Sequence, residues 1–428
     1  MVPPKLPLVK AEAGERGSGS TGSLAPSPAA WAVFVTLPLL VMAYSLWKSP
    51  LWWTIPRDPT DWDAAQYAAH GQFGWIYSPV TNLVSFPGYA YLSIPVAALS
   101  NLFHLGSLAR GSEGTLHPTA WYLWGPWVAL TGGSIVLAVD SVASFLGVSQ
   151  GRRAVLAIVE GILVWQLLAL FTHPEDALAV SLFLWAWLAS QRGRWTVAGW
   201  LMGAAIAVQP VVLLVLPILF VCSPARGRLA LVVRSAVPSV VLLLPELVTD
   251  FGRTTTALLK QPNFPTLDHP TPLLFMAPHL GLIVKTPTVA AGPARLISLA
   301  LCCLVAYAIH RRPQSPVRLV WCFALCFAFR SMVESVMDPY YLWPALALAV
   351  LAAASTRWLY FTLATLASIL MTGYAQSQHT PWVWWGPLVV GMGIVLCAAF
   401  PVRSAATPVE EPADVEGSSD VAPSTLAG

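Results

Sequence analysis

Apolar runs dominate the sequence and limit what the chain can fold into. Only 10% of its 428 residues are charged, whereas soluble globular domains carry about 25%. A water-soluble fold of this length could not bury so much apolar surface, and a membrane-spanning helix requires about 20 apolar residues. We therefore expect an all-α polytopic membrane protein. The runs lie at 31–47, 89–105, 119–146, 155–171, 177–190, 197–209, 211–222, 229–249, 295–309, 318–332, 340–354, 358–372 and 383–400.

Two polar segments flank this apolar region. Residues 1–30 are rich in Gly, Ser and Pro and contain no apolar core that precedes a cleavage site, so they indicate a disordered cytoplasmic tail and not a signal peptide. Residues 403–428 form an acidic tail of the same kind. The transmembrane domain is therefore predicted to extend over residues 31–402.

Short basic connections predict the topology, because such connections face the cytoplasm. They contain Arg152 and Arg153, Arg192 and Arg194, Arg226 and Arg228, Arg311 and Arg312, and Arg357. This rule places outside the segment 48–88, the turn at 172–176, a break at Gln209-Pro210, the long loop 250–294, the turn at 333–339 and the loop 373–382. Either 89–105 is interfacial or re-entrant, which gives about twelve spans with both ends inside, or the rule fails once. We favour the first alternative, with helices in the external loops.

Several function classes are excluded by what the sequence lacks. The net charge is +3 and no basic stretch is dense enough to follow a nucleic-acid backbone, so nucleic acid is not an expected partner. No Gly-rich nucleotide-binding turn is present. The six cysteines lie in apolar runs and none has metal-ligand spacing with a histidine, so they read as small apolar residues.

The first external loop combines acids with aromatic residues. Asp58, Asp61 and Asp63 follow the first span, in a loop rich in Trp, Tyr and Phe. Aromatic rings stack on sugar faces, and a carboxylate can accept a hydroxyl proton, so the loop suits a sugar site. Alternatively, Asp61 caps a helix at 62–69.

A second polar group interrupts two apolar runs at 172–176. His173, Glu175 and Asp176 would lie at the outer end of a helical hairpin. They are candidates for substrate binding. The alternative is that the two acids only stabilise a helix N-terminus.

A third group borders a later span. Arg330 and Glu334 are four residues apart, a spacing that predicts an ion pair on one helix face, and Tyr340 and Tyr341 follow. Arg is well matched to a phosphate, so Arg330 is a candidate phosphate ligand; a structural ion pair is the alternative. Asp140 and Glu160 are further candidates because ionisable groups inside apolar runs are costly, or they lie near span ends.

The chain resembles the GT-C glycosyltransferases, most closely the actinobacterial polyprenyl-phosphate-mannose-dependent mannosyltransferases of glycosyltransferase family 87. Asp63 and Tyr67 match an Asp in the first external loop with a Tyr four residues on. The segments at 86–88 and 94–95 resemble a proline-rich approach to the next helix, with Gly88 where a Pro is expected. The sequence GAAIAVQP at 203–210 resembles a helix that ends in Lys-Pro, with Gln209 at the Lys position.

This resemblance implies a multi-pass plasma-membrane enzyme whose active site faces outward. It would transfer a sugar, with mannose favoured, from a polyprenyl-phosphate donor to a lipid or glycan acceptor, with inversion. Membrane lipids would be its other partners. Asp63 would be the base, with Asp61 as the second candidate. The substrate-binding residues would be Tyr67, His173, Glu175, Asp176, Gln209, Arg330, Glu334, Tyr340 and Tyr341.

Other readings of the sequence remain. Some members of the superfamily use a divalent metal, but no ligand cluster in this sequence requires one, and no other cofactor is implied. A lipid-linked glycan transporter or flippase predicts internal repeats and charges at the bilayer midplane. A polysaccharide polymerase and a non-catalytic scaffold are the further alternatives.

Overall fold

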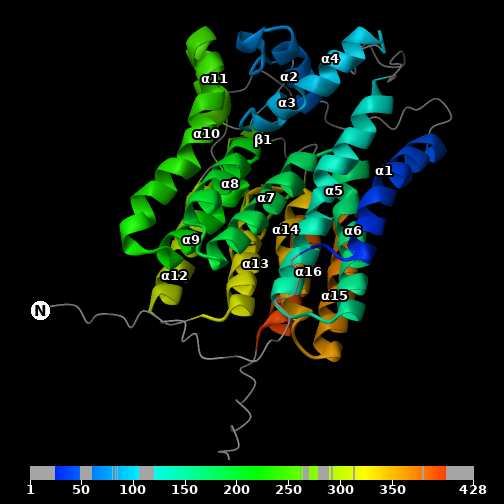
Figure 1. The fold of residues 1–428 in the computed structure, drawn as a ribbon, viewed down its shortest axis with the longest axis vertical. Coiled ribbons are helices and arrows are strands. Elements are labelled where there is room, and N and C mark those ends of the chain that lie inside the picture. The colour runs from blue at the N-terminus through cyan, green and yellow to red at the C-terminus, as the bar shows by residue number, and fades with distance from the viewer. Residues whose placement is uncertain are drawn as a thin grey trace, which may run out of the picture.

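The fold is almost entirely helical, as the apolar runs predict. The computed structural model describes residues 25–48, 60–79, 81, 83, 85–105, 120–260, 262–263, 269–277, 289–290, 293–311, 314–377 and 380–401. Within these residues there are sixteen α-helices, and the four β-strands are two residues long each. The helices run roughly antiparallel and form one bundle (Figure 1).

Seven helical segments of the described chain are long and apolar enough to cross a membrane. Their outer faces carry large apolar side chains, such as Leu39, Leu370 and Val390, which are more than 60% exposed. Such faces suit lipid contact. The chain is therefore a helical membrane protein. The seven segments are Pro28–Trp47 in α1 (Pro28–Lys48), Trp121–Phe145 (α5), Gln150–Leu170 (α6, Gln150–Trp165, with η2, Gln166–Leu170), Ala225–Thr249 (η4, Ala225–Gly227, with α10, Arg228–Thr249), Pro316–Val333 (α13), Trp358–Ala375 (α15) and Pro381–Ala399 (α16).

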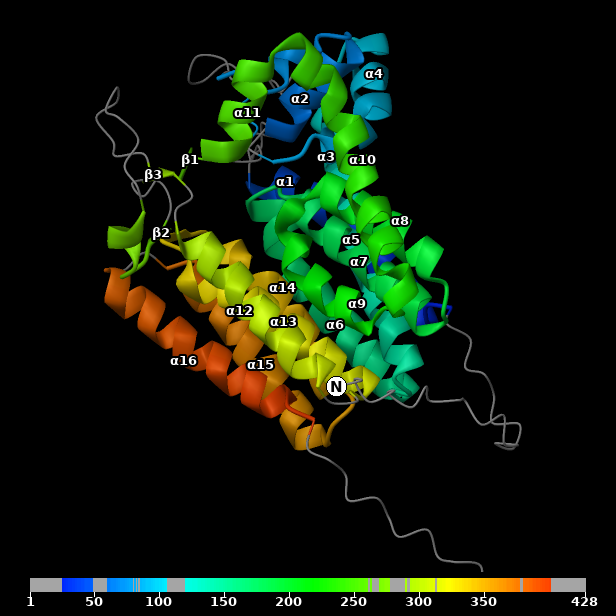
Figure 2. The ribbon, with the colours of Figure 1, turned by 90° about the vertical axis from the view of Figure 1, so that its left-hand side faces the viewer.

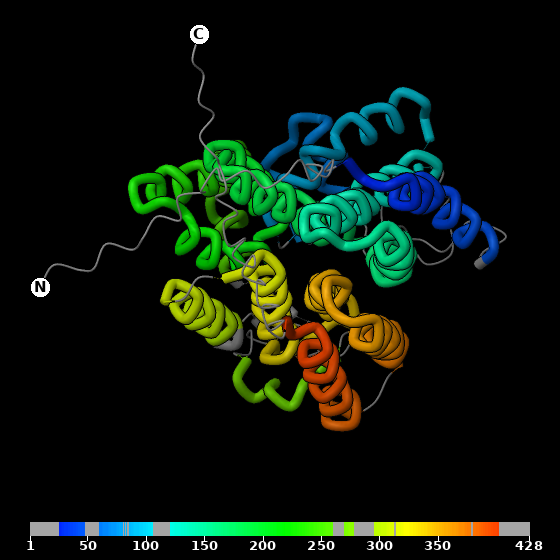
Figure 3. The backbone as a smooth tube through the Cα atoms, turned by 60° about the horizontal axis from the view of Figure 1, so that its bottom comes forward, coloured from blue at the N-terminus to red at the C-terminus, as the bar shows by residue number. Residues whose placement is uncertain are grey.

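Five further helical segments lie among them. They are α7 (Pro174–Gln191), α8 (Trp195–Val208), η3 (Pro210–Val215) with α9 (Leu216–Cys222), α12 (Pro293–His310), and η6 (Pro339–Leu342) with α14 (Trp343–Ala353). Every residue of α14 is buried, and this helix contacts α5, α6, α13, α15 and α16. The helices from α12 onward form one side of the bundle and the earlier ones the other (Figure 3). The figure of about twelve spans stays a prediction.

The run at 89–105 does not form a spanning helix. It is divided into α3 (Gly88–Leu92) and α4 (Ile94–Leu102), and both are too short to cross a bilayer. They lie with α2 (Thr60–Ala69), η1 (Phe73–Trp75) and α11 (Phe251–Lys260) at one end of the bundle (Figures 1 and 2). We call this the loop end. The interfacial interpretation of 89–105 agrees with this arrangement.

The long external loop predicted at 250–294 contains a helix, a 3₁₀ turn and short strands. Helix α11 follows α10, and η5 (Leu274–Met276) follows further on. Strand β1 (Pro262–Asn263) pairs antiparallel with β3 (Val289–Ala290), and β2 (His269–Pro270) with β4 (Val336–Met337). The predicted turn at 333–339 thus includes a strand. Asp58, Asp268, His279 and Lys285 lie outside the described residues.

The short basic connections gather at the opposite end, which we call the basic end. Here the backbone N–H of Ser27 donates to Asp140 Oδ2 (2.6 Å), and Arg153 pairs with the same carboxylate (2.5 Å). Arg152 donates to the carbonyl oxygens of Ala354 (2.9 Å) and Thr356. Asp140 therefore fastens the start of α1 to α5 and α6. It is a structural ion-pair partner and lies away from the loop end.

Candidate functional site

An irregular junction between α6 and α7 forms the centre of the candidate site. The last turn of α6 widens into the π-helix η2, and Thr172 then has φ = +59°. Positive φ is unusual for a β-branched residue, and π-helical turns and strained residues concentrate at functional sites. The chain turns within the predicted segment 172–176, at Thr172 and His173, and Pro174 already begins α7. This geometry directs a group of polar side chains inward.

His173 is held from two sides. Its Nδ1 lies 2.7 Å from Glu175 Oε1, and its ring stacks on Tyr340 with centroids 4.5 Å apart. Tyr340 comes from η6, more than 160 residues later in the sequence. The structure therefore brings the second and third polar groups of the sequence together.

Glu175 and Asp176 are buried, although they occupy the first turn of a helix. Within the described part of the chain, Glu175 Oε2 and Asp176 Oδ1 have no hydrogen-bond partner. Burying a carboxylate oxygen without a partner is costly. Helix capping alone does not account for these two acids, because a cap satisfies its oxygens with backbone N–H groups.

Arg330 lies on the other side of these acids. It interacts electrostatically with Glu334 and Asp176 and lies over the ring of Tyr341, with its Cζ 4.0 Å from the centroid. Among the described residues it forms no ion pair within 4.0 Å. Its guanidinium group is therefore available to an anion.

The predicted ion pair between Arg330 and Glu334 is wrong. Helix α13 ends at Val333 and Glu334 has extended backbone (ψ = 140°), so the four-residue spacing no longer places the two side chains on one helix face. Glu334 instead pairs with Arg295 of α12 (3.1 Å). Its carbonyl oxygen accepts a hydrogen bond from Thr271 Oγ1 (2.7 Å). Glu334 thus holds α12 and the segment after α11 against the end of α13.

Gln209 joins the same group from the break between α8 and η3. Its Oε1 accepts a hydrogen bond from Ser85 Oγ (2.9 Å), and it also interacts with Asp176. The predicted break at Gln209-Pro210 is confirmed. We refer to Thr172, His173, Glu175, Asp176, Gln209, Arg330, Tyr340 and Tyr341 as the helix-end cluster.

Gly88 and Gln209, the two positions where the resemblance to family 87 fails, lie close together in the fold. A Cβ on Gly88 would lie 2.2 Å from the carbonyl oxygen of Ala207, two residues before Gln209. Ser85, three residues before Gly88, binds Gln209. The absence of a side chain at Gly88 therefore lets the start of α3 press against the end of α8. Gly88 and Gln209 therefore belong to the same contact, between the start of α3 and the end of α8.

The acids of the first loop lie in a helix that begins earlier than expected. Helix α2 starts at Thr60, so Asp61 and Asp63 are in its first turn, and Asp61 does not cap a helix at 62–69. Both are buried. Asp61 interacts electrostatically with Tyr89, and Tyr89 also interacts with Glu175. Asp61 thus neighbours the helix-end cluster.

Tyr67 lies one turn after Asp63 in the same helix, as the spacing predicted. Its ring stacks on Trp75, with centroids 6.0 Å apart. The ring centroid of Trp75 lies 5.5 Å from Cζ of Arg253, a residue of α11. Tyr67 therefore packs at the side of the first loop, where α11 covers it.

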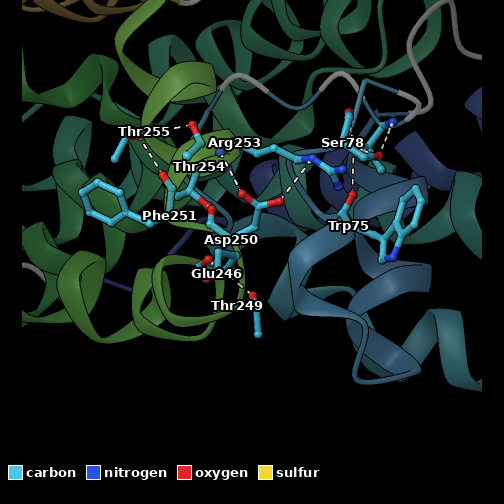
Figure 4. A network of polar contacts seen from close by, with 11 residues as sticks. Trp75, Ser78, Glu246, Thr249, Asp250, Phe251, Arg253, Thr254 and Thr255 are labelled. Atoms are coloured by element: carbon cyan, nitrogen blue, oxygen red, sulfur yellow. Dashed lines mark hydrogen bonds and ion pairs between the residues drawn. The ribbon is translucent and has the colours of Figure 1, made fainter.

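The sequence interpretation overlooked Glu246, near the end of α10. This side chain is fully buried, and Oε1 accepts a hydrogen bond from Tyr91 Oη (2.6 Å). Oε2 has no partner in the described chain. Figure 4 shows Glu246 beneath Asp250 and Arg253, which face Trp75 and Ser78. An acid inside the apolar run 229–249 was a signal of the kind applied to Asp140 and Glu160.

Two tyrosines, Tyr77 and Tyr91, lie close to Glu246. Tyr91 donates to it, and Tyr77 lies nearby and donates to the carbonyl oxygen of Ser85 (2.8 Å). Burial raises the pKa of the Tyr77 phenol well above its ordinary value, and the charges of Glu246, Tyr91 and Asp61 raise it further. The phenol thus stays protonated and remains the donor to the carbonyl oxygen of Ser85.

Glu160 lies apart from this group, within α6. Its Oε1 accepts a hydrogen bond from Trp343 Nε1 (3.1 Å), and Oε2 has no partner among the described residues. It is neither close to a span end nor joined to the helix-end cluster by any contact of the described chain. It links α6 to the buried helix α14.

No group of three or more His, Cys, Asp or Glu side chains could hold a metal ion in the described segments. No protein-family model matches the chain, and no curated protein matches it. The function must therefore be argued from the site itself.

Proposed function

We propose that the protein is a glycosyltransferase of the plasma membrane that uses a polyprenyl-phosphate sugar and works at the outer face. The observation that carries the proposal is the helix-end cluster: within the described part of the chain, buried carboxylate oxygens without hydrogen-bond partners lie near an arginine that forms no ion pair within 4.0 Å. Such an arrangement is costly in a folded protein unless a ligand completes it. A phosphate and a sugar together supply the missing anion and the missing hydroxyl donors.

The donor phosphate would contact Arg330. A guanidinium group can form two parallel hydrogen bonds to a phosphate, and Tyr341 fixes its plane. The Gln209 amide takes the place where the family pattern has a cation. Sugar hydroxyls would donate to Glu175 and Asp176, and the stacked His173 and Tyr340 rings would border the sugar.

The transfer needs one base and no strong acid. A carboxylate of α2 would accept the proton of an acceptor hydroxyl while its oxygen attacks the anomeric carbon. The bond from that carbon to the phosphate oxygen breaks, and the polyprenyl phosphate leaves with the electron pair. Arg330 would stabilise the charge that develops on the leaving oxygen. Asp63 keeps the family spacing to Tyr67, and Asp61 neighbours Tyr89; both are candidates for the base.

Transfer by purified protein tests the proposal. Polyprenyl-phosphate mannose, glucose and arabinose would each be supplied with a membrane-lipid extract as acceptor, and labelled product would be measured. Asp63→Asn should lower the rate by about 10²–10⁴, the usual cost of losing a general base, with donor affinity unchanged. Asp61→Asn should have the smaller effect. The reverse order would assign the base to Asp61.

Transport is the competing function, and the same preparation separates it. In sealed vesicles a flippase would move the labelled donor across the bilayer without cleaving it, and a polymerase would yield products of many lengths. Donor movement without transfer, or equal transfer by the wild type and both Asn variants, would refute the proposed mechanism.

A further inference from the structure

A cavity lies at the basic end, away from the helix-end cluster. Its volume is about 390 Å³, and it opens between the end of α12 and the start of α13. Val305, Ile309 and Leu325 give it an apolar lining, while Arg311 and Arg318 lie at its border. An apolar hollow bordered by two cations is complementary to a lipid with an anionic headgroup.

Neither arginine is neutralised by a carboxylate of the described chain. Arg311 donates to the Tyr307 hydroxyl and lies over that ring, with its Cζ 4.8 Å from the centroid. Cζ of Arg318 lies 5.9 Å from the ring centroid of Phe400. Asp140 is the carboxylate described at this end, and Arg153 holds it.

The wall of the cavity is held in place by α16. Trp321 donates from Nε1 to the carbonyl oxygen of Leu396 (2.8 Å), and its ring meets Phe400 edge-on at 5.0 Å. The aromatic wall and Arg318 are therefore fixed before a ligand arrives. A preformed site binds with a smaller loss of conformational entropy.

We propose that this cavity binds an anionic phospholipid, with the phosphate at Arg311 and Arg318 and an acyl chain against Val305, Ile309 and Leu325. Basic pockets between membrane helices are typical binding places for such headgroups. The position fits, because α12 exposes the apolar side chains Leu296, Leu299 and Leu304, and Arg311 and Arg318 lie at the end of α12 and the start of α13. The proposal does not depend on the glycosyltransferase function.

Native mass spectrometry of the full-length protein in detergent tests it, with phosphatidylglycerol and phosphatidylcholine titrated separately. The wild type should bind one phosphatidylglycerol with saturation and bind phosphatidylcholine much more weakly. Arg311→Gln with Arg318→Gln should weaken phosphatidylglycerol binding by about tenfold or more, since each basic residue contributes about 1 kcal/mol near an anionic surface.

Two matched variants make the result decisive. Arg192→Gln with Arg194→Gln removes the same charge from exposed residues at the same end, and binding should be unchanged. Ala308→Trp fills the cavity from an exposed position without changing charge, and binding should fall. Equal loss in both double variants, or full binding by Ala308→Trp, would overturn the proposal. Binding that appears only after removal of 403–428 would assign the cavity to the acidic tail instead.

Discussion

At the scale of residues, Arg295 and Arg330 have different roles because their side-chain partners differ. Arg295 neutralises Glu334, and Arg330 lies against Tyr341 and faces Asp176. The two cations are close in the fold but differ in what remains available to a ligand. This difference gives a direct test of the phosphate role.

Arg330→Gln should raise the Michaelis constant for the polyprenyl-phosphate donor by about 10–100-fold, since a charged hydrogen bond contributes about 1.5–3 kcal/mol. Its unfolding temperature in detergent should stay near that of the wild type. Arg295→Gln should instead lower thermal stability and leave donor binding intact, and Glu334→Gln should match it. A donor defect shared equally by both arginine variants would contradict the assignment.

Gly88 is the second position where one residue decides a contact. Gly88→Ala should destabilise the protein by about 1–3 kcal/mol, the usual cost of overpacking, because the new Cβ meets the backbone of Ala207. Gly151→Ala is the control, since no atom lies within 4 Å of its Cβ position. Thermal unfolding of both variants in one detergent measures the difference. Equal stability of the two would show that α3 adjusts freely.

At the scale of elements, the junction of α6, η2 and α7 determines where the polar side chains point. A π-helical turn inserts one residue more than an α-helical turn would hold, and Thr172 then reverses direction with a positive φ. The result is that His173, Glu175 and Asp176 face Tyr340 and Arg330 and do not face lipid. The site is thus built by an irregularity of one helix.

Thr172→Gly should stabilise the protein by up to about 1 kcal/mol, because glycine adopts positive φ without the penalty that L-residues carry. Thr172→Ala retains that penalty and should not stabilise. Unfolding temperatures in detergent distinguish the two variants. If alanine stabilised as much as glycine, the buried hydroxyl and not the backbone would be the source of the strain.

Local patterns were sufficient for the helices, the turn at 172–176 and the break at Gln209. They were not sufficient for contacts between distant segments. The partner of Glu334 is Arg295, 39 residues away, and no spacing rule predicts it once the helix ends at Val333. The acid Glu246 within the apolar run 229–249 was a visible signal, but its contact with Tyr91 spans 155 residues and no local pattern predicts that partner.

At the scale of the whole molecule, the two ends of the bundle differ in chemistry. The loop end carries α2, α3, α4 and α11 together with the helix-end cluster (Figure 2). The basic end carries the short arginine connections and the cavity of Arg311 and Arg318. Because basic connections face the cytoplasm, the loop end should face outward.

Impermeant thiol labelling of intact cells checks this orientation. A cysteine at Gln72, which is exposed at the loop end, should react, and one at Arg194, exposed at the basic end, should react only after permeabilisation. Wild-type protein labelled in parallel gives the background from the six native cysteines. Reaction at residue 194 but not at 72 would invert the topology.

The contact of Ser27 with Asp140 also has a consequence for the order of assembly during synthesis. Asp140 is made 113 residues after Ser27, which at about 5–20 residues per second corresponds to roughly 6–23 seconds. Throughout that interval Ser27 lacks its partner Asp140, and α6, a later neighbour of the first helix, has not yet been made. The earliest span must therefore wait in the bilayer, and its docking is a late event in the formation of the bundle.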